Sequence, residues 1–122
     1  MIAPLFPVCA ASLAVTALLG AKPKVRIYPF GENPEKPVYP YVVWQNMGGA
    51  SPMYLDTTPD VDSFSLQIDV YADTGAQAIA VAAAVRDAIE RHAYITRWGG
   101  QSIDPDTKKC RYSFDVSWVV KR

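Results

Sequence analysis

The chain lacks an excess of charge of either sign: its 122 residues include 12 Lys and Arg and 12 Asp and Glu. This balance gives no general electrostatic attraction to nucleic acid or to an anionic membrane. We therefore expect neither a sequence-specific nucleic-acid partner nor a membrane partner. Cysteine is also scarce. Cys9 and Cys110 are far apart in the sequence, so they form neither a disulfide framework nor a metal-ligand cluster, and we interpret them as small apolar residues in a reducing compartment.

A long uninterrupted hydrophobic run is missing as well. The apolar segment 1–20 resembles the core of a signal peptide, but no Lys or Arg precedes it and two prolines interrupt it. It is also too broken to span a bilayer comfortably. We expect two short helices instead, one near Ala3–Ala11 and one that Ser12 caps and Gly20 stops. A targeting peptide is the alternative, whereas short helices would belong to the folded domain.

Residues suited to catalysis or metal binding are few. His92 is the only histidine, and at the end of a predicted helix it can simply favour the negative end of the helix dipole. The aspartates between residues 56 and 62 lack the glycine and terminal glutamate of a calcium loop. Asp69 and Asp115 would serve acid/base chemistry only if they were adjacent, and solvent exposure or pairing with Arg or Lys is the commoner role. We predict no enzyme, no cofactor and no metal site.

The most informative stretch runs from residue 62 to residue 91. Within it, apolar residues first recur every two residues, as in a strand, and then about every 3.6 residues, as in a helix. Polar and apolar residues alternate over Ser63–Tyr71, which predicts a strand buried on one side. Thr74 and Gln77 then have the spacing of a capping box, so a helix starts there. Its apolar positions form one stripe of mostly small side chains that can approach a sheet closely: Ala78, Val81, Ala82, Val85, Ala88 and Ile89.

Strand patterns cover four further segments: Val25–Tyr28, Val38–Gln45, Ala93–Ile103 and Lys108–Val120. The last two flank a turn at Asp104–Thr107 and form a hairpin, and the glycines after Trp98 indicate a bulge. We assign the chain to the α+β class. It is expected to form a single domain over residues 1–122, with an antiparallel sheet of about four strands, one main helix packed on it, and short N-terminal helices.

Surface available for a partner is concentrated in a few places. The predicted loop of residues 47–60 is long for a hairpin connection, and long loops on compact domains are often functional. The hairpin around Trp98–Thr107 is the second candidate patch, and the polar face of the sheet is also available for assembly. The candidate interface residues are Met53, Tyr54, Leu55, Asp56, Asp69, Arg97, Trp98 and Asp115.

Four segments taken together, in the same order of elements, resemble a family of tailed-phage tail-completion proteins related to the tail terminators of long-tailed phages and prophages. These segments are Arg26-Ile-Tyr-Pro29, Tyr39-Pro-Tyr-Val-Val-Trp44, Ser63-Phe-Ser-Leu-Gln-Ile-Asp-Val-Tyr-Ala72 and Val85-Arg-Asp-Ala-Ile89. The resemblance covers nearly the whole chain. It implies a small α+β protein that assembles as a ring, a hexamer, on the head-proximal end of the tail tube. There it stops tube growth and presents a surface to the head connector, and no catalytic residues come with it.

The partners that the resemblance implies are further copies of the chain, the tail tube protein and the head–tail connector proteins. Its implied location is the virion tail, assembled in the cytoplasm of the bacterial host. The residues independently favour an interface function, because they build no evident active site and leave loops and a polar sheet face free for assembly. Two rivals stay open, a small secreted or cytoplasmic binding domain and a small hydrolase built around His92 or the two strand aspartates.

Overall fold

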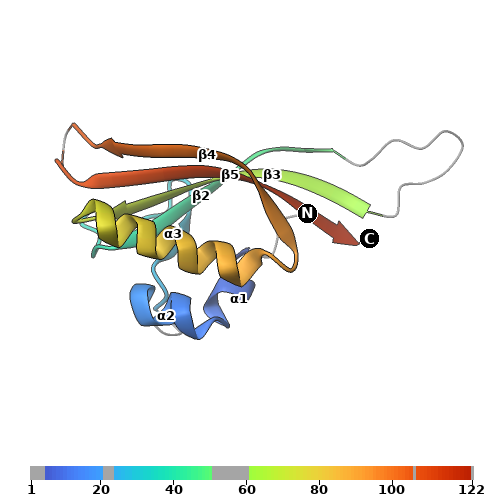
Figure 1. Ribbon diagram of the computed structural model, residues 1–122, viewed down its shortest axis with the longest axis horizontal. Coiled ribbons are helices and arrows are strands. Elements are labelled where there is room, and N and C mark those ends of the chain that lie inside the picture. The colour runs from blue at the N-terminus through green and yellow to red at the C-terminus, as the bar shows by residue number, and fades with distance from the viewer. Residues whose placement is uncertain (1–4, 21–23, 51–60, 106, 122) are drawn as a thin grey trace, which may run out of the picture.

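The computed structural model describes residues 5–20, 24–50, 61–105 and 107–121 (Figure 1). The elements follow one another as α1 (Leu5–Ala10), α2 (Leu13–Leu19), β1 (Ile27–Pro29), β2 (Tyr41–Ala50), β3 (Val61–Ala72), α3 (Gly75–Ile89), β4 (Ala93–Ile103) and β5 (Cys110–Lys121). Helix α3 lies against one face of the sheet, and α1 and α2 lie against α3 (Figure 1). The α+β prediction is confirmed. No helix within the described ranges has the length and apolar character needed to cross a membrane.

The sheet has the order β1-β2-β3-β5-β4. Its strands are antiparallel except at one edge, where the short β1 adds a fifth strand parallel to β2. The sequence predicted an antiparallel sheet of about four strands, so this edge is a correction. The cause is the connection of residues 30–40. Its prolines cannot continue a hairpin ladder, so the chain crosses back and re-enters the sheet in the same direction.

The main helix begins where the sequence predicts. The Thr74 hydroxyl accepts a hydrogen bond from the Gln77 backbone N–H at 3.2 Å. The Gln77 side chain reaches back to the backbone N–H of Asp73, also at 3.2 Å, rather than to that of Thr74. The box is thus one residue wider than the usual form, but it still satisfies amides that the first turn leaves without partners.

One core joins the helix stripe to the inner face of the sheet. Cross-strand register places Leu66 opposite Val116 and Ile68 opposite Phe114, and all four side chains are fully buried. The predicted shared core is confirmed, with Tyr112 packed at its border rather than inside it. The fully buried members include Leu66, Ile68, Val81, Val85, Ile89, Phe114, Val116 and Trp118.

The two short helices predicted near the N-terminus are present as α1 and α2. Ser12 caps α2 by accepting a hydrogen bond from the Val15 backbone N–H, as predicted, and Gly20 ends it with a φ of 92°. Leu5, Cys9, Val15 and Leu19 are buried in the common core. The guanidinium of Arg26 then donates to the carbonyls of Leu18 and Pro40, which ties the end of α2 to the start of β2.

Strand β2 is longer than the sequence predicted. It runs to Ala50, so residues 47–50 are strand and not part of a loop. The register shifts between Asn46 and Gly48, which indicates a bulge. Met47 is the extra residue of this bulge, and Gly48 and Gly49 continue the pairing with β3 opposite Ser65 and Phe64.

Candidate functional site

The face of the sheet opposite the helices is not covered by any described helix (Figure 1). We call it the open face. Register and alternation place on its three long central strands the residues Tyr41, Val43, Gln45, Ser65, Gln67, Asp69, Tyr71, Arg111, Ser113, Asp115 and Ser117. Most of these residues are polar, and Tyr41 and Tyr71 lie together at one end.

Side-chain hydrogen bonds cross three strands of the open face. Gln45 donates from Nε2 to Oε1 of Gln67 at 3.4 Å. Gln67 Nε2 in turn lies 3.2 and 3.3 Å from the two carboxylate oxygens of Asp69. Arg111 completes the row, with its Nη2 3.0 Å from Asp69 Oδ1. Such a network holds long polar side chains in one arrangement, as a recognition surface requires.

Asp69 is the most enclosed charged group of this row, with a residue exposure of only 8%. A buried carboxylate is tolerable only when it is paired and hydrogen-bonded. Burial by itself would lower the pKa of Arg111, but the charge and hydrogen bond of the Asp69 carboxylate raise that pKa above its usual value. Arg111 therefore stays charged, and its buried Nε has no hydrogen-bond partner in the described structure.

The two strand aspartates do not form a carboxylate dyad. Asp69 lies opposite Ser113, whereas Asp115 lies opposite Gln67, so the two are diagonal neighbours. Each is satisfied by its own arginine: Asp115 Oδ2 is 3.0 Å from Arg97 Nε. This arrangement argues against the form of the hydrolase alternative that relies on the two aspartates, because each carboxylate is paired with an arginine and not with the other.

A tyrosine cluster closes one end of the open face. The rings of Tyr41 and Tyr71 stack with centroids 4.9 Å apart and planes at 15°, and Tyr39 and Tyr28 pack around Tyr41. Burial, followed by the charges of Tyr39 and Tyr71, raises the pKa of Tyr41 to about 12. The sequence analysis did not predict this cluster. The available signal was the position of Tyr41 near the start of one predicted strand and of Tyr71 at the end of the next, because antiparallel pairing places these two ends side by side.

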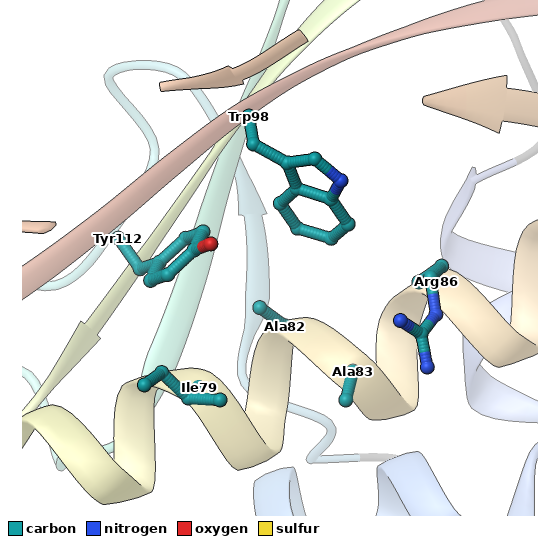
Figure 2. A pocket seen from close by; sticks show the side chains of 6 residues that line it. All are labelled: Ile79, Ala82, Ala83, Arg86, Trp98 and Tyr112. Carbon is teal, nitrogen blue, oxygen red and sulfur yellow. The ribbon is translucent and has the colours of Figure 1, made fainter. Parts of the chain in front are cut away.

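Trp98 lies on the helix side and not on the open face. Its indole packs on Phe114 at 5.1 Å and edge-on against Tyr112 at 5.7 Å. It is nevertheless 44% exposed, because it forms one wall of a groove between α3 and the β4 edge of the sheet (Figure 2).

We call this hollow the edge groove. Its volume is about 240 Å³, and α1 and α2 contribute none of the residues that line it. Alanines from α3 form its floor, and Figure 2 shows Trp98 and Tyr112 facing them across the opening. The lining consists of Ile79, Ala82, Ala83, Arg86, Trp98 and Tyr112.

The remaining predicted residues have simpler surroundings or are not described. Met53, Tyr54, Leu55 and Asp56 lie outside the described residues. The His92 ring stacks parallel on Trp118 with centroids 6.1 Å apart and planes at 6°. That contact gives the histidine an aromatic packing role.

The cysteines are both free. Cys9 is buried, and this burial raises the pKa of its thiol to about 12, which suppresses the reactive thiolate. Across the described part of the chain, no three His, Cys, Asp or Glu side chains gather as a metal site would require.

Comparison with known proteins supplies the family. The family model described as tail completion protein gp17 matches residues 3–121. No curated protein matches the chain. A chain from a solved structure titled "Virion of native gene transfer agent (GTA) particle" is similar in fold, with a TM-score of 0.69 and 20% sequence identity over 97% of this chain and 92% of that chain. The chain therefore belongs to the tail completion protein gp17 family, and it is a structural protein of the virion tail and not an enzyme.

Proposed function

We propose that the protein caps the head-proximal end of a phage tail tube as a ring of identical copies, a hexamer, ends tube polymerisation and forms the surface that joins the tail to the head. The observation that carries this proposal is the family match over residues 3–121. A tail completion role requires a protein that works through its surfaces, because its partners are other virion proteins.

The described surfaces suit such a role. A ring needs heterologous contacts, in which one patch on a subunit meets a different patch on its neighbour. This molecule has a polar open face, with Asp69, Arg97 and Asp115 held in ion pairs, and a separate apolar groove beside α3. Two chemically different surfaces allow contacts with the tube, the connector and the next subunit at the same time.

The candidate residues divide between two proposed contacts. Met53, Tyr54, Leu55 and Asp56 are proposed to contact a neighbouring copy or the tail tube, because apolar side chains in a long connection need a partner. The open-face charges Arg97 and Asp115 are proposed to meet polar groups of another virion protein, and the enclosed Asp69 is proposed to contribute to that contact by holding Arg111 in place. Exposed charged pairs add little affinity but fix orientation and exclude wrong partners.

The test combines solution mass with tail length. Purified protein should sediment as a species several times the monomer mass, and its gene should restore tails of uniform length to a phage that lacks the corresponding gene. Negative-stain electron microscopy measures tail length and shows the capped end. Tails of uniform length without this protein would contradict termination, and a chain that stays monomeric both alone and on tails would contradict the ring.

A further inference from the structure

We propose that the edge groove of one copy receives the Phe30 side chain of the next copy. This head-to-tail contact would hold the ring together. The inference rests on the proposed ring, but it assigns the contact between subunits to two particular sites on the chain. Its occupant is a second copy of the same chain.

The groove has the size and lining of an aromatic binding site. An apolar protein cavity of about 150 Å³ can hold a benzene molecule, and the edge groove measures about 240 Å³. Ile79 and Trp98 border it and remain 50% and 44% exposed. Packing of Trp98 against Tyr112 and Phe114 fixes its indole in place. A partly buried tryptophan with an open apolar side is a common anchor for a partner.

Phe30 supplies a matching knob. Phe30 is 71% exposed, yet the turn that carries it is held by two backbone hydrogen bonds. The Phe30 N–H donates to the Trp44 carbonyl at 2.8 Å, and the Glu32 N–H donates to the Pro29 carbonyl at 3.0 Å. Between them, Gly31 has a φ of 85°, a turn conformation that glycine adopts readily. A preformed turn loses little conformational entropy when it binds.

The two sites lie at opposite edges of the sheet. Phe30 follows β1, which is one edge strand, and Trp98 belongs to β4, which is the other. Three strands separate these edges, and four interstrand spacings amount to roughly 19 Å. A knob at one edge and a groove at the other lead to head-to-tail association, which closes into a ring when the rotation allows.

Charge complements shape at this contact. Arg86 lines the groove, and its ion pair within the described ranges is with its exposed neighbour Asp87, at 3.0 Å. Such an exposed pair is weak and easily exchanged. Two residues after Phe30, the Glu32 carboxylate is exposed and has no ion-pair partner among the described residues. When Phe30 enters the groove, Glu32 is carried toward Arg86 of the neighbour.

The first test is cross-linking between subunits. In a Cys110→Ser background, the double variant Glu32→Cys/Arg86→Cys keeps Phe30 and the apolar lining intact. The buried Cys9 is not accessible to reagent. A short bismaleimide should link successive copies into a ladder that ends at the ring, whereas each single variant should stay unlinked. An equimolar mixture of the two single variants should give linked dimers only.

The matched control is Leu13→Cys/Arg86→Cys, which places one thiol on another exposed position. It should give no ladder. Three results would overturn the inference. Linking of Arg86→Cys to itself would show a symmetric contact, and absence of a ladder both in solution and on tails would show that the groove does not meet Phe30. A link from Arg86→Cys to the tube protein would likewise assign the groove to another partner.

The second test measures affinity. Phe30→Ser should raise the protein concentration needed for ring formation about tenfold or more, because it removes the central apolar anchor. Val38→Ser, an exposed apolar change in the same connection, should raise it by less than about threefold. Circular dichroism checks that both variants fold. Equal effects of the two substitutions would overturn the inference.

These results separate the inference from the proposed function. A cross-linked ladder in solution together with unchanged tail length in the Phe30→Ser phage would support the contact and contradict tail capping. Rings that cap tails normally but never cross-link through Glu32→Cys/Arg86→Cys would support capping and overturn the contact.

Discussion

At the scale of single residues, burial separates side chains that stabilise the fold from those that are free to meet a partner. Phe114 and Asp69 are both enclosed, one in the core and one on the open face, whereas Phe30 and Arg97 are exposed. Removing an enclosed group leaves a cavity or an unpaired charge. Removing an exposed group leaves the monomer nearly unchanged.

Phe114→Ala should lower the free energy of unfolding by about 3–5 kcal/mol, because the side chain is fully buried between the sheet and α3. Urea denaturation of the two proteins measures the difference. Phe30→Ala is the matched control and should cost less than about 0.5 kcal/mol, since Phe30 is exposed. A loss under roughly 1 kcal/mol for Phe114→Ala would place this ring outside the core.

Asp69→Ala should destabilise the monomer by about 1–3 kcal/mol, because Arg111 and Gln67 lose their shared acceptor. Asp115→Ala is the control. Its arginine partner is largely exposed, so the expected loss is under about 1 kcal/mol. Both values come from urea denaturation. Equal losses would mean that the Asp69 pair is screened by solvent as fully as the Asp115 pair.

At the scale of secondary structure, the sequence predicts strands and helices well where the period of apolar residues is unbroken. It predicts them poorly where bulges interrupt that period. The alternation in β3 and the stripe in α3 matched the structure, because each has one face in the core. In β4, register shifts between Ile95 and Arg97 and again between Trp98 and Gly100. Each bulge reverses the face of the residues that follow, so sequence alternation does not reveal that Trp98 faces α3.

The pairing of β2 with β3 also creates a pH-dependent contribution to stability. The pKa of Tyr41 is raised to about 12 in the folded protein, above the ordinary value of about 10 for an unfolded chain. The folded state therefore holds this proton more tightly, and its stabilising effect is complete below about pH 10 and lost as the pH rises toward 12.

Tyr41→Phe should accordingly flatten the loss of stability between about pH 10 and pH 12. Thermal midpoints measured across this range, beside the absorbance change of tyrosine ionisation, test the expectation. An alkaline loss of the same size in the variant would show that other groups control it.

At the scale of the whole molecule, the sequence indicates that function resides in surfaces, but it does not show which surface contacts which partner. The resemblance of four segments to tail-completion proteins led to the correct family, and the residues themselves favoured an interface function. The edge groove escaped prediction because it is formed by α3, β4 and β5 together. Likewise, the ion pair of Asp69 with Arg111 depends on cross-strand register between residues 42 positions apart. Both features arise from tertiary packing that no local pattern records.

The connection between β2 and β3 gives the last prediction. Replacing Tyr54 and Leu55 with serine should leave the monomer folded, because the described core is built without them, but it should reduce ring formation or attachment to purified tails. Met47→Ser is the matched control, since Met47 is an exposed apolar residue on β2. Circular dichroism measures folding, sedimentation measures ring formation, and electron microscopy measures capped ends and tail length. Normal rings on tails of normal length would remove these two residues from the interface, whereas an unfolded monomer would place them in the core.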